Sequence, residues 1–220
     1  MFIWDCVIHA CVTSPLFVRT IYTSWLFEHK FIEKFLHFLI RAMPTEILKN
    51  YDRKFLTCEI FNSLSLAQIN DDNLTLGRYA CHLYTEVLKK LPAVVRKWWN
   101  ILPSRKKSFL DKLTTNFVSP LICDEELKSI YTNKEKHENM QVTVHLSTRE
   151  VLAVYFVDDV RTELTITLSS NYPLGPVKVD CGKNIGGRLS SRNIIMQLAL
   201  FLTHQVITYL PYSYLGIQRC

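Results

Sequence analysis

The stretch from residue 163 to residue 187 constrains the fold most, because it joins two short alternating segments through a rigid corner. Residues 164–168 alternate leucine or isoleucine with threonine, which predicts a strand with one buried face. Residues 177–180 alternate again and predict a second short strand. The residues between them favour tight turns, and such a corner indicates a scaffold and not an active site. The corner is defined by Asn171, Tyr172, Pro173, Gly175 and Pro176.

Two further strands are predicted just upstream of this corner. Residues 142–146 alternate in the same way, and residues 151–157 are almost continuously apolar, which predicts a strand covered on both faces. The turns at 147–149 and 158–159 are too short for a crossover connection. All four strands must therefore run antiparallel, as a meander over about residues 140–181.

A closing helix and an all-helical N-terminal part are predicted on either side of this meander. Apolar residues recur at helical spacing over about residues 189–204, so this helix can lie across the sheet. Helices gathered on one face of an antiparallel meander make an α+β fold. Residues 1–100 read as successive helix pairs, which are typical of the end of a helical solenoid.

The first forty residues are unusually apolar. Residues 1–27 are interrupted by charged side chains and lack a preceding basic region, so a buried helix is predicted and not a signal peptide or a membrane span. Residues 31–40 are apolar nearly all round, which predicts packing on more than one neighbour. Pro44 is expected to end this helix.

The next predicted helices are placed by proline and by polar segments. Residues 46–66 show helical spacing. Residues 76–100 form a long helical pattern that contains Pro92, which predicts a kink or two consecutive helices. Residues 103–120 predict another helix, and the lysine- and glutamate-rich residues 123–140 predict a short helix and a solvated linker.

Composition excludes some classes of protein. Apolar residues make up 48% of the chain, which predicts a packed core and not disorder. The net charge of +6 permits a phosphate-bearing partner without requiring one. The seven cysteines are odd in number and form no Cys-x-x-Cys pair, which favours reduced thiols in a cytosolic protein over a disulfide framework or a zinc ribbon.

Five stretches carry a resemblance to a known family: residues 91–100, 118–121, 148–151, 170–175 and 203–205. Together with the meander and the closing helix, they are similar to the RWD domain, a relative of ubiquitin-conjugating enzymes that lacks their active site. The similarity is closer still to RING-type E3 ubiquitin ligases of ribosome-associated quality control, and it covers roughly residues 74–205.

The resemblance implies a division of the chain. Residues 1–100 would be the end of a HEAT-like solenoid, residues 101–205 the RWD domain, and residues 206–220 a divergent tail in place of the RING. A RING holds zinc through four ligands per ion, whereas this tail has one cysteine and no histidine. The resemblance therefore implies no catalytic residue, cofactor or metal in this chain. Zinc, and contact with a ubiquitin-conjugating enzyme, would belong to the RING.

The densest basic cluster lies beside Trp98 and Trp99 and is a candidate contact for ribosomal RNA phosphates, driven by counterion release. The alternative is a solvated helix face with the tryptophans packed in the core. Adjacent residues of a helix point about 100° apart, so the two rings cannot share the centre of one face. With two residues of the glycine-rich exit included, the candidates are Arg96, Lys97, Arg105, Lys106, Lys107, Lys112, Lys183 and Arg188.

Two further features have a chemical and a structural interpretation. Cys181 follows the corner roughly where a ubiquitin-conjugating enzyme approaches its nucleophile, but the chain has no His-Pro-Asn tripeptide to stabilise an oxyanion, so an inert thiol is predicted. Residues 182–188 are glycine-rich, but the lysine stands on the wrong side for a P-loop, so a flexible connection is predicted.

The resemblance implies a ribosome-docking module of a ubiquitin ligase that acts on stalled nascent chains. The expected partner is the large ribosomal subunit, through its protein and its RNA, in the cytosol and without a membrane. Whether the chain is an enzyme is left open, and by itself it is expected not to transfer ubiquitin. The alternatives are a stand-alone protein-interaction RWD module and a degenerate conjugating enzyme that uses Cys181.

Overall fold

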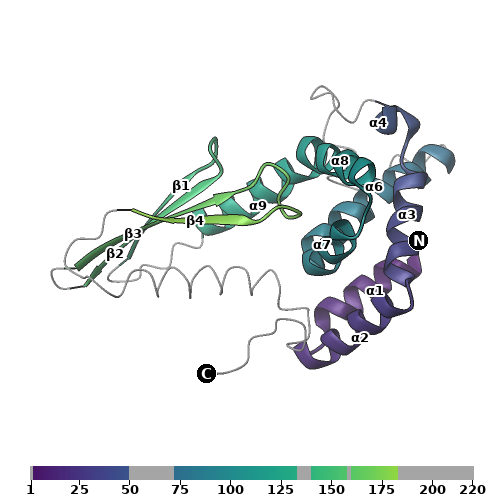
Figure 1. Cartoon of the computed structure of the whole chain (residues 1–220), viewed down its shortest axis with the longest axis horizontal. Helices are drawn as coiled ribbons and strands as arrows, with labels where there is room; N and C mark the ends of the chain where they lie inside the picture. The colour runs from purple at the N-terminus through teal and green to yellow at the C-terminus, as the bar shows by residue number, and fades with distance from the viewer. Residues whose placement is uncertain (1, 50–71, 133–139, 158–159, 183–220) are drawn as a thin grey trace. The chain divides into compact units, whose positions relative to one another are not determined.

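The computed structural model of this chain describes residues 2–49, 72–132, 140–157 and 160–182 (Figure 1). These residues belong to two compact units, a helical unit that ends at Val118 and a sheet unit that begins at Ser119. The predicted α+β order, helices first and a four-stranded antiparallel sheet after them, is confirmed.

The helical unit is a succession of short helices whose breaks fall at prolines. Pro15, Pro44 and Pro103 stand immediately before helices, and Pro92 occupies the first turn of one. Proline is tolerated at these positions because the N–H it lacks has no partner within the helix. The helices are α1 (Phe2–Thr13), α2 (Leu16–Glu28), α3 (Phe31–Ala42), α4 (Thr45–Lys49), α6 (Asp72–Lys90), α7 (Pro92–Asn100), α8 (Ser104–Leu113) and the π-helix η2 (Thr114–Val118).

Two predictions about the helices made from proline have different outcomes. The two consecutive helices predicted around Pro92 are confirmed as α6 and α7. The single helix predicted over 103–120 is wrong at its C-terminal end. After α8 the helix becomes the π-helix η2. It is followed by α9 (Ser119–Thr132), which has Pro120 in its first turn. The predicted short helix after residue 123 is the end of α9, and residues 133–139 lie outside the described residues.

The core of the helical unit gathers on α3, α6 and α7. The buried face of α3 carries Ile32, Phe35 and Leu36, and α3 packs against α2, α6 and α7, as its apolar pattern predicted. Trp98 of α7 is almost completely buried and meets His37 edge-on, with ring centroids 5.4 Å apart. Because these side chains occupy one side of each helix, the packing also determines which side of α3 and of α7 faces outward.

The N-terminal helices are less buried than predicted. The first 27 residues form two helices, and α2 exposes a row of large apolar side chains: Leu16, Phe17, Val18, Ile21, Tyr22 and Trp25. In α3, Phe31 and Phe38 are 40% and 49% exposed, although the pattern placed them in the core. Apolar composition alone misses this distinction, because a helix in a stack has a neighbour on only part of its surface.

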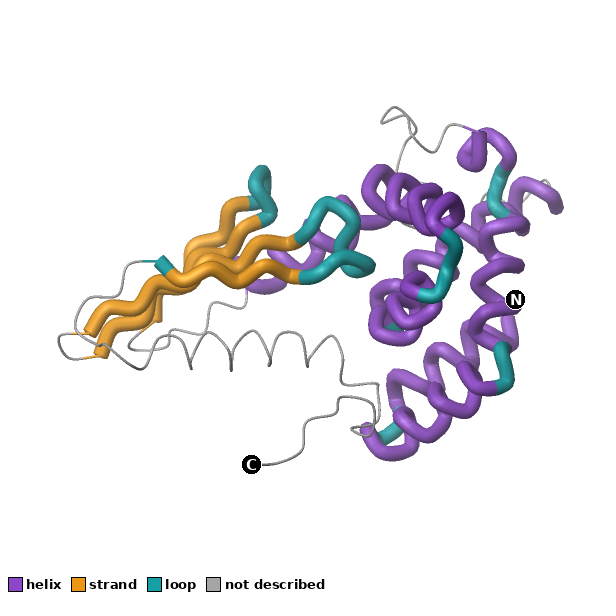
Figure 2. Tube along the Cα trace, in the orientation of Figure 1, coloured by secondary structure: helices purple, strands orange, loops and turns teal. Residues whose placement is uncertain are grey.

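The sheet unit contains the predicted meander. Its strands are β1 (Met140–His145), β2 (Glu150–Val157), β3 (Val160–Leu168) and β4 (Val177–Cys181), in spatial order β1-β2-β3-β4 and antiparallel throughout (Figure 2). Val151 and Val154 point to opposite faces of β2 and both are buried, as expected for a strand covered on both sides. The predicted turn at 158–159 and the closing helix at 189–204 lie outside the described residues.

Candidate functional site

The corner at residues 169–176 is held by one arginine from a neighbouring turn. The Arg149 guanidinium donates hydrogen bonds to the carbonyl oxygens of Ser170 and Ser169, at 3.1 and 3.5 Å, and to Ser119 Oγ of α9 at 2.9 Å. The backbone of Arg149 has φ of 57°, and its carbonyl accepts from the Leu168 N–H at 3.0 Å. Arg149 therefore ties the turn before β2, the corner and α9 together.

Tyr172 makes the second tie between the corner and α9. Its ring is buried, and its hydroxyl donates to the Glu126 carboxylate, with 3.0 and 2.9 Å to the two oxygens. The peptide bond between Tyr172 and Pro173 is cis. A side chain at Gly175 would place its Cβ 2.1 Å from Asn171 Oδ1, so the corner has no room for one. These contacts make the corner a structural joint inside the sheet unit.

The predicted basic cluster lies on α7 and α8, and two of its lysines rest on aromatic rings. Lys107 Nζ is 3.7 Å from the centre of the Trp99 ring and 3.5 Å from Asn100 Oδ1, and Lys97 Nζ is 4.0 Å from the Phe27 ring. Trp99 is half-buried whereas Trp98 is buried, which is the separation that adjacent helical positions predict. An aromatic face attracts an ammonium group and holds it near the surface.

The first turn of α8 concentrates positive charge where a helix already has a positive end. Arg105 and Lys106 are exposed there, Lys107 follows, and the turn contains no acidic residue. The preceding residue, Pro103, caps no backbone N–H with its side chain. Basic side chains are unfavourable at this end of a helix dipole by a few tenths of a kcal/mol, so helix stability does not explain them. Their arrangement suits an anion.

The remaining basic candidates have mixed outcomes. Arg96 is half-buried on α7, and Lys112 is exposed in the last turn of α8. Lys183 and Arg188 lie outside the described residues. Six of the predicted residues thus lie on α7 and α8, in the same helical unit. Whether they bind RNA remains a prediction.

Three of the described thiols, those of Cys11, Cys81 and Cys123, are buried, whereas Cys6 is exposed. Burial raises the pKa of Cys81 to about 12, and it also raises the pKa of Cys11 and of Cys123. A thiol with a raised pKa is a poor nucleophile near neutral pH. Cys181 is the last residue of β4, with its backbone opposite Leu164. Within the described part of the chain, no three metal-ligating side chains lie close enough together to hold an ion.

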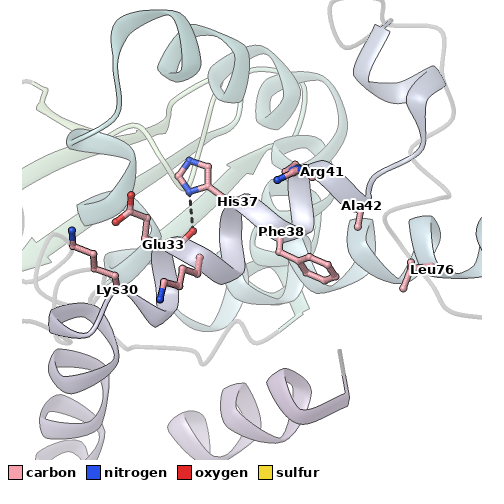
Figure 3. Close-up of a pocket in the computed structure, with 8 residues that line it drawn as sticks. Lys30, Glu33, His37, Phe38, Arg41, Ala42 and Leu76 are labelled. Carbon is pink, nitrogen blue, oxygen red and sulfur yellow. Dashed lines mark hydrogen bonds between the residues drawn. The ribbon is translucent and has the colours of Figure 1, made fainter.

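Sequence reasoning missed a second basic surface, on the outward side of α3. The residues Lys30, Glu33, Lys34, His37, Phe38, Arg41, Ala42 and Leu76 line an open groove of about 720 Å³ (Figure 3). The spacing of the cations is visible in the sequence, but residues 31–40 were interpreted as a helix that is apolar nearly all round. The contacts of Arg149 and Glu126 were missed as well: residues 148–151 carried the family resemblance and Glu126 was part of a charged segment, but neither pattern indicates a tie to the corner.

Comparison with known proteins places both parts of the chain. The LTN1 family HEAT repeat region matches residues 1–131, and a ubiquitin conjugating domain-like family matches residues 140–208. The HEAT match includes α9, which lies in the sheet unit. No helix in the described ranges is long and apolar enough to cross a bilayer. The class of protein is therefore a HEAT-type helical region followed by a domain of ubiquitin-conjugating type.

The chain belongs to the listerin family of E3 ubiquitin-protein ligases. It is 63% identical over 205 residues to the E3 ubiquitin-protein ligase listerin of Drosophila melanogaster, covering 93% of this chain. It is 33% identical over 212 residues to that of Mus musculus and 36% identical over 198 residues to that of Gallus gallus, covering 92% and 86% of this chain. It spans 11–12% of the length of these relatives.

Proposed function

We propose that this chain is a ribosome-docking part of a listerin ligase, one that acts on stalled nascent chains at the large ribosomal subunit in the cytosol. In this proposal the sheet unit is an RWD domain, and docking uses ribosomal RNA and protein. Family membership supports the ligase context. In this proposal, zinc binding and the contact with a ubiquitin-conjugating enzyme are functions of a RING. We assign neither function to the described residues.

The observation that carries the docking proposal is the first turn of α8. Arg105, Lys106 and Lys107 add three cations to the positive end of the helix, and Lys107 is fixed on the Trp99 ring. The backbone N–H groups of residues 104–106 precede the first i→i−4 hydrogen bond of α8, which the Lys107 N–H makes to the Pro103 carbonyl oxygen at 3.0 Å. A phosphate at this position would meet cations and N–H donors together, which is the arrangement expected of a contact with a nucleic-acid backbone.

Co-sedimentation with purified large ribosomal subunits tests this proposal. The whole chain is expected to sediment with the subunits at low salt and to dissociate steeply as salt rises, because each phosphate contact releases counterions. The double variant Arg105→Glu/Lys106→Glu is expected to bind more weakly and with a shallower salt dependence. The matched control is Lys128→Glu/Lys178→Glu, which changes the net charge equally at exposed lysines of the sheet unit.

Two outcomes would contradict the docking proposal. The first is that the chain remains in the supernatant at low salt. The second is that both double variants lose binding equally, which would indicate attraction by net charge and not by α8. Binding that persists unchanged at high salt would instead favour the stand-alone protein-interaction module, because an apolar protein interface is little affected by screening.

A second candidate function remains for the sheet unit, a degenerate ubiquitin-conjugating enzyme. The match to the ubiquitin conjugating domain-like family extends across Cys181, and this is the observation that favours it. The test is a thioester assay with ubiquitin and activating enzyme. A reducible ubiquitin adduct that disappears in Cys181→Ser would establish this function, and the docking proposal predicts no adduct. The docking proposal also predicts that the chain does not speed the discharge of ubiquitin from a conjugating enzyme that carries it as a thioester.

A further inference from the structure

The outward face of α3 alternates aromatic and cationic side chains. Its exposed positions are Phe31, Lys34, Phe38 and Arg41. Their spacing of three, four and three residues puts all of them on one side of the helix, over about 15 Å of its length. The opposite side carries the buried Ile32, Phe35, Leu36 and Leu39. The alternation is therefore a surface feature and not a by-product of core packing.

The aromatic part of this face continues beyond α3. Trp25 of α2 is 46% exposed and stacks on Phe31, with ring centroids 5.5 Å apart. His29 lies against both rings, at 4.6 Å from Trp25 and 6.4 Å from Phe31. Leu76 of α6 also lines the groove and is 46% exposed, but it offers an apolar side chain without a ring. Planar rings are thus available to a partner at the Phe31 end of the row and at Phe38 within it.

The cationic part of the face is not neutralised by its surroundings. In the described part of the chain, the structure shows no salt bridge to Lys30, Lys34 or Arg41. One acidic residue, Glu33, lines the groove with them (Figure 3). His37 is engaged elsewhere, since its Nδ1 lies 2.9 Å from the Glu33 carbonyl oxygen and its ring packs on Trp98. Three cations against one carboxylate leave the groove positive.

We propose that this face of α3 binds single-stranded RNA. A single strand offers one phosphate and one planar base per nucleotide, and the face offers cations and rings in alternation. Bases stack on the half-exposed rings of Phe31 and Phe38, and Lys34 and Arg41 meet the backbone phosphates between them. An acidic peptide matches the charge but presents no row of π-faces, and a duplex hides its bases. The site is separate from the first turn of α8 and does not depend on ribosome docking.

The test is fluorescence anisotropy of the whole chain with a labelled oligouridylate of twelve nucleotides. The variant Phe31→Ala/Phe38→Ala is expected to weaken binding about tenfold or more, as stacked bases contribute that much each. The variant Lys34→Glu/Arg41→Glu is expected to weaken binding and to flatten its dependence on salt. All four positions are exposed, so an unchanged thermal transition by circular dichroism will show that the variants are folded.

Two matched controls separate this site from other effects. Ile130→Ala/Tyr131→Ala removes two exposed apolar side chains of α9, in the sheet unit, and it is expected to leave oligonucleotide binding unchanged. Arg105→Glu/Lys106→Glu tests the docking surface, and it is expected to change oligonucleotide binding far less than the α3 variants do. The docking proposal can fail while this result stands, and the reverse also holds.

Several results would overturn the inference. One is oligonucleotide affinity that Phe31→Ala/Phe38→Ala leaves intact, which would reduce the face to a general positive charge. Another is competition by duplex RNA or by polyglutamate as effective as that by unlabelled single strand. A third is binding to vesicles containing phosphatidylserine in the absence of any binding to the oligonucleotide, which would make the face a membrane-surface site.

Discussion

In the helical unit Trp98 and Tyr84 lie among apolar side chains, whereas the corner of the sheet unit is fixed by two charged groups, Arg149 and Glu126. Apolar packing is spread over many atoms, so its contribution to stability falls when a large side chain is replaced by a small one. The hydrogen bonds of the corner depend on a few donors and acceptors, so their contribution to stability is lost when one of these groups is removed. The two units should therefore differ in which substitutions they tolerate, and spectroscopy can follow them separately because all four tryptophans lie in the helical unit.

The largest effect is expected from Trp98→Ala. Trp98 is 1% exposed, and its truncation leaves a cavity between α3 and α7, so the free energy of unfolding should fall by about 3–5 kcal/mol. Trp99→Ala, one position away, should cost less than half as much because Trp99 is half-buried. Urea unfolding followed by circular dichroism measures both. Equal costs for the two variants would mean that the described burial is not what stabilises this unit.

A second large effect should appear at alkaline pH through Cys81. Burial raises the pKa of this thiol from 9.0 to about 12, so the folded chain keeps a proton that the unfolded chain releases. The contribution of the Cys81 thiol to the free energy of unfolding is fully present below pH 9. It is lost as the pH rises toward 12, because the unfolded state then binds fewer protons than the folded state. At about pH 10.5 the loss amounts to about 2 kcal/mol.

The control for this alkaline effect is Cys81→Ala. Its stability should fall less between pH 8 and about pH 10.5 than that of the unmodified chain, by the share that the thiol contributes. Tryptophan fluorescence in urea, under reducing conditions, gives both stabilities. Parallel pH profiles for the two chains would show that Cys81 does not titrate across this range. Part of the loss should remain in the variant, because burial also raises the pKa of Tyr84.

How much of this could be foreseen from the sequence depended on the type of signal. The meander followed from a period of two and from turns too short for a crossover, and the structure contains it at the predicted positions. The break at Pro92 followed from the missing N–H of proline. The same reasoning failed at Pro120, because a proline in the first turn of α9 starts a helix as readily as it ends one.

The sites were harder to foresee than the fold. The basic residues of α7 and α8 were visible as a run, but the rings under Lys97 and Lys107 depend on which face of each helix is buried. The α3 face was misread because phenylalanine suggests a core position whatever its neighbours are. Arg149 acts through contacts with residues 20 and 30 positions away in sequence, which no local pattern reveals.

A moderate effect is expected when the arginine tie is removed. Arg149→Met leaves Ser119 Oγ and the carbonyl oxygen of Ser170 without their donor, so the sheet unit should lose about 1.5–3 kcal/mol. Hydrogen exchange of the corner peptide, followed by mass spectrometry, should become faster. Arg149→Lys keeps the charge but not the planar donor group. Its free energy of unfolding should therefore lie between those of the unmodified chain and Arg149→Met. If the corner remained as well protected in Arg149→Met, the polar side of the comparison would fail.

The smallest effect is expected from Tyr172→Phe, which keeps the buried ring and removes the hydroxyl. Glu126 is exposed and regains water when its donor is lost, so the cost should be only about 1 kcal/mol. A double-mutant cycle with Glu126→Gln isolates the pair, since each single variant weakens the same hydrogen bond and the double variant should add little more. Additive costs would show that Tyr172 and Glu126 act independently. The corner would then be held by the packing of the ring, as the helical unit is, and the contrast between the two units would narrow to Arg149 alone.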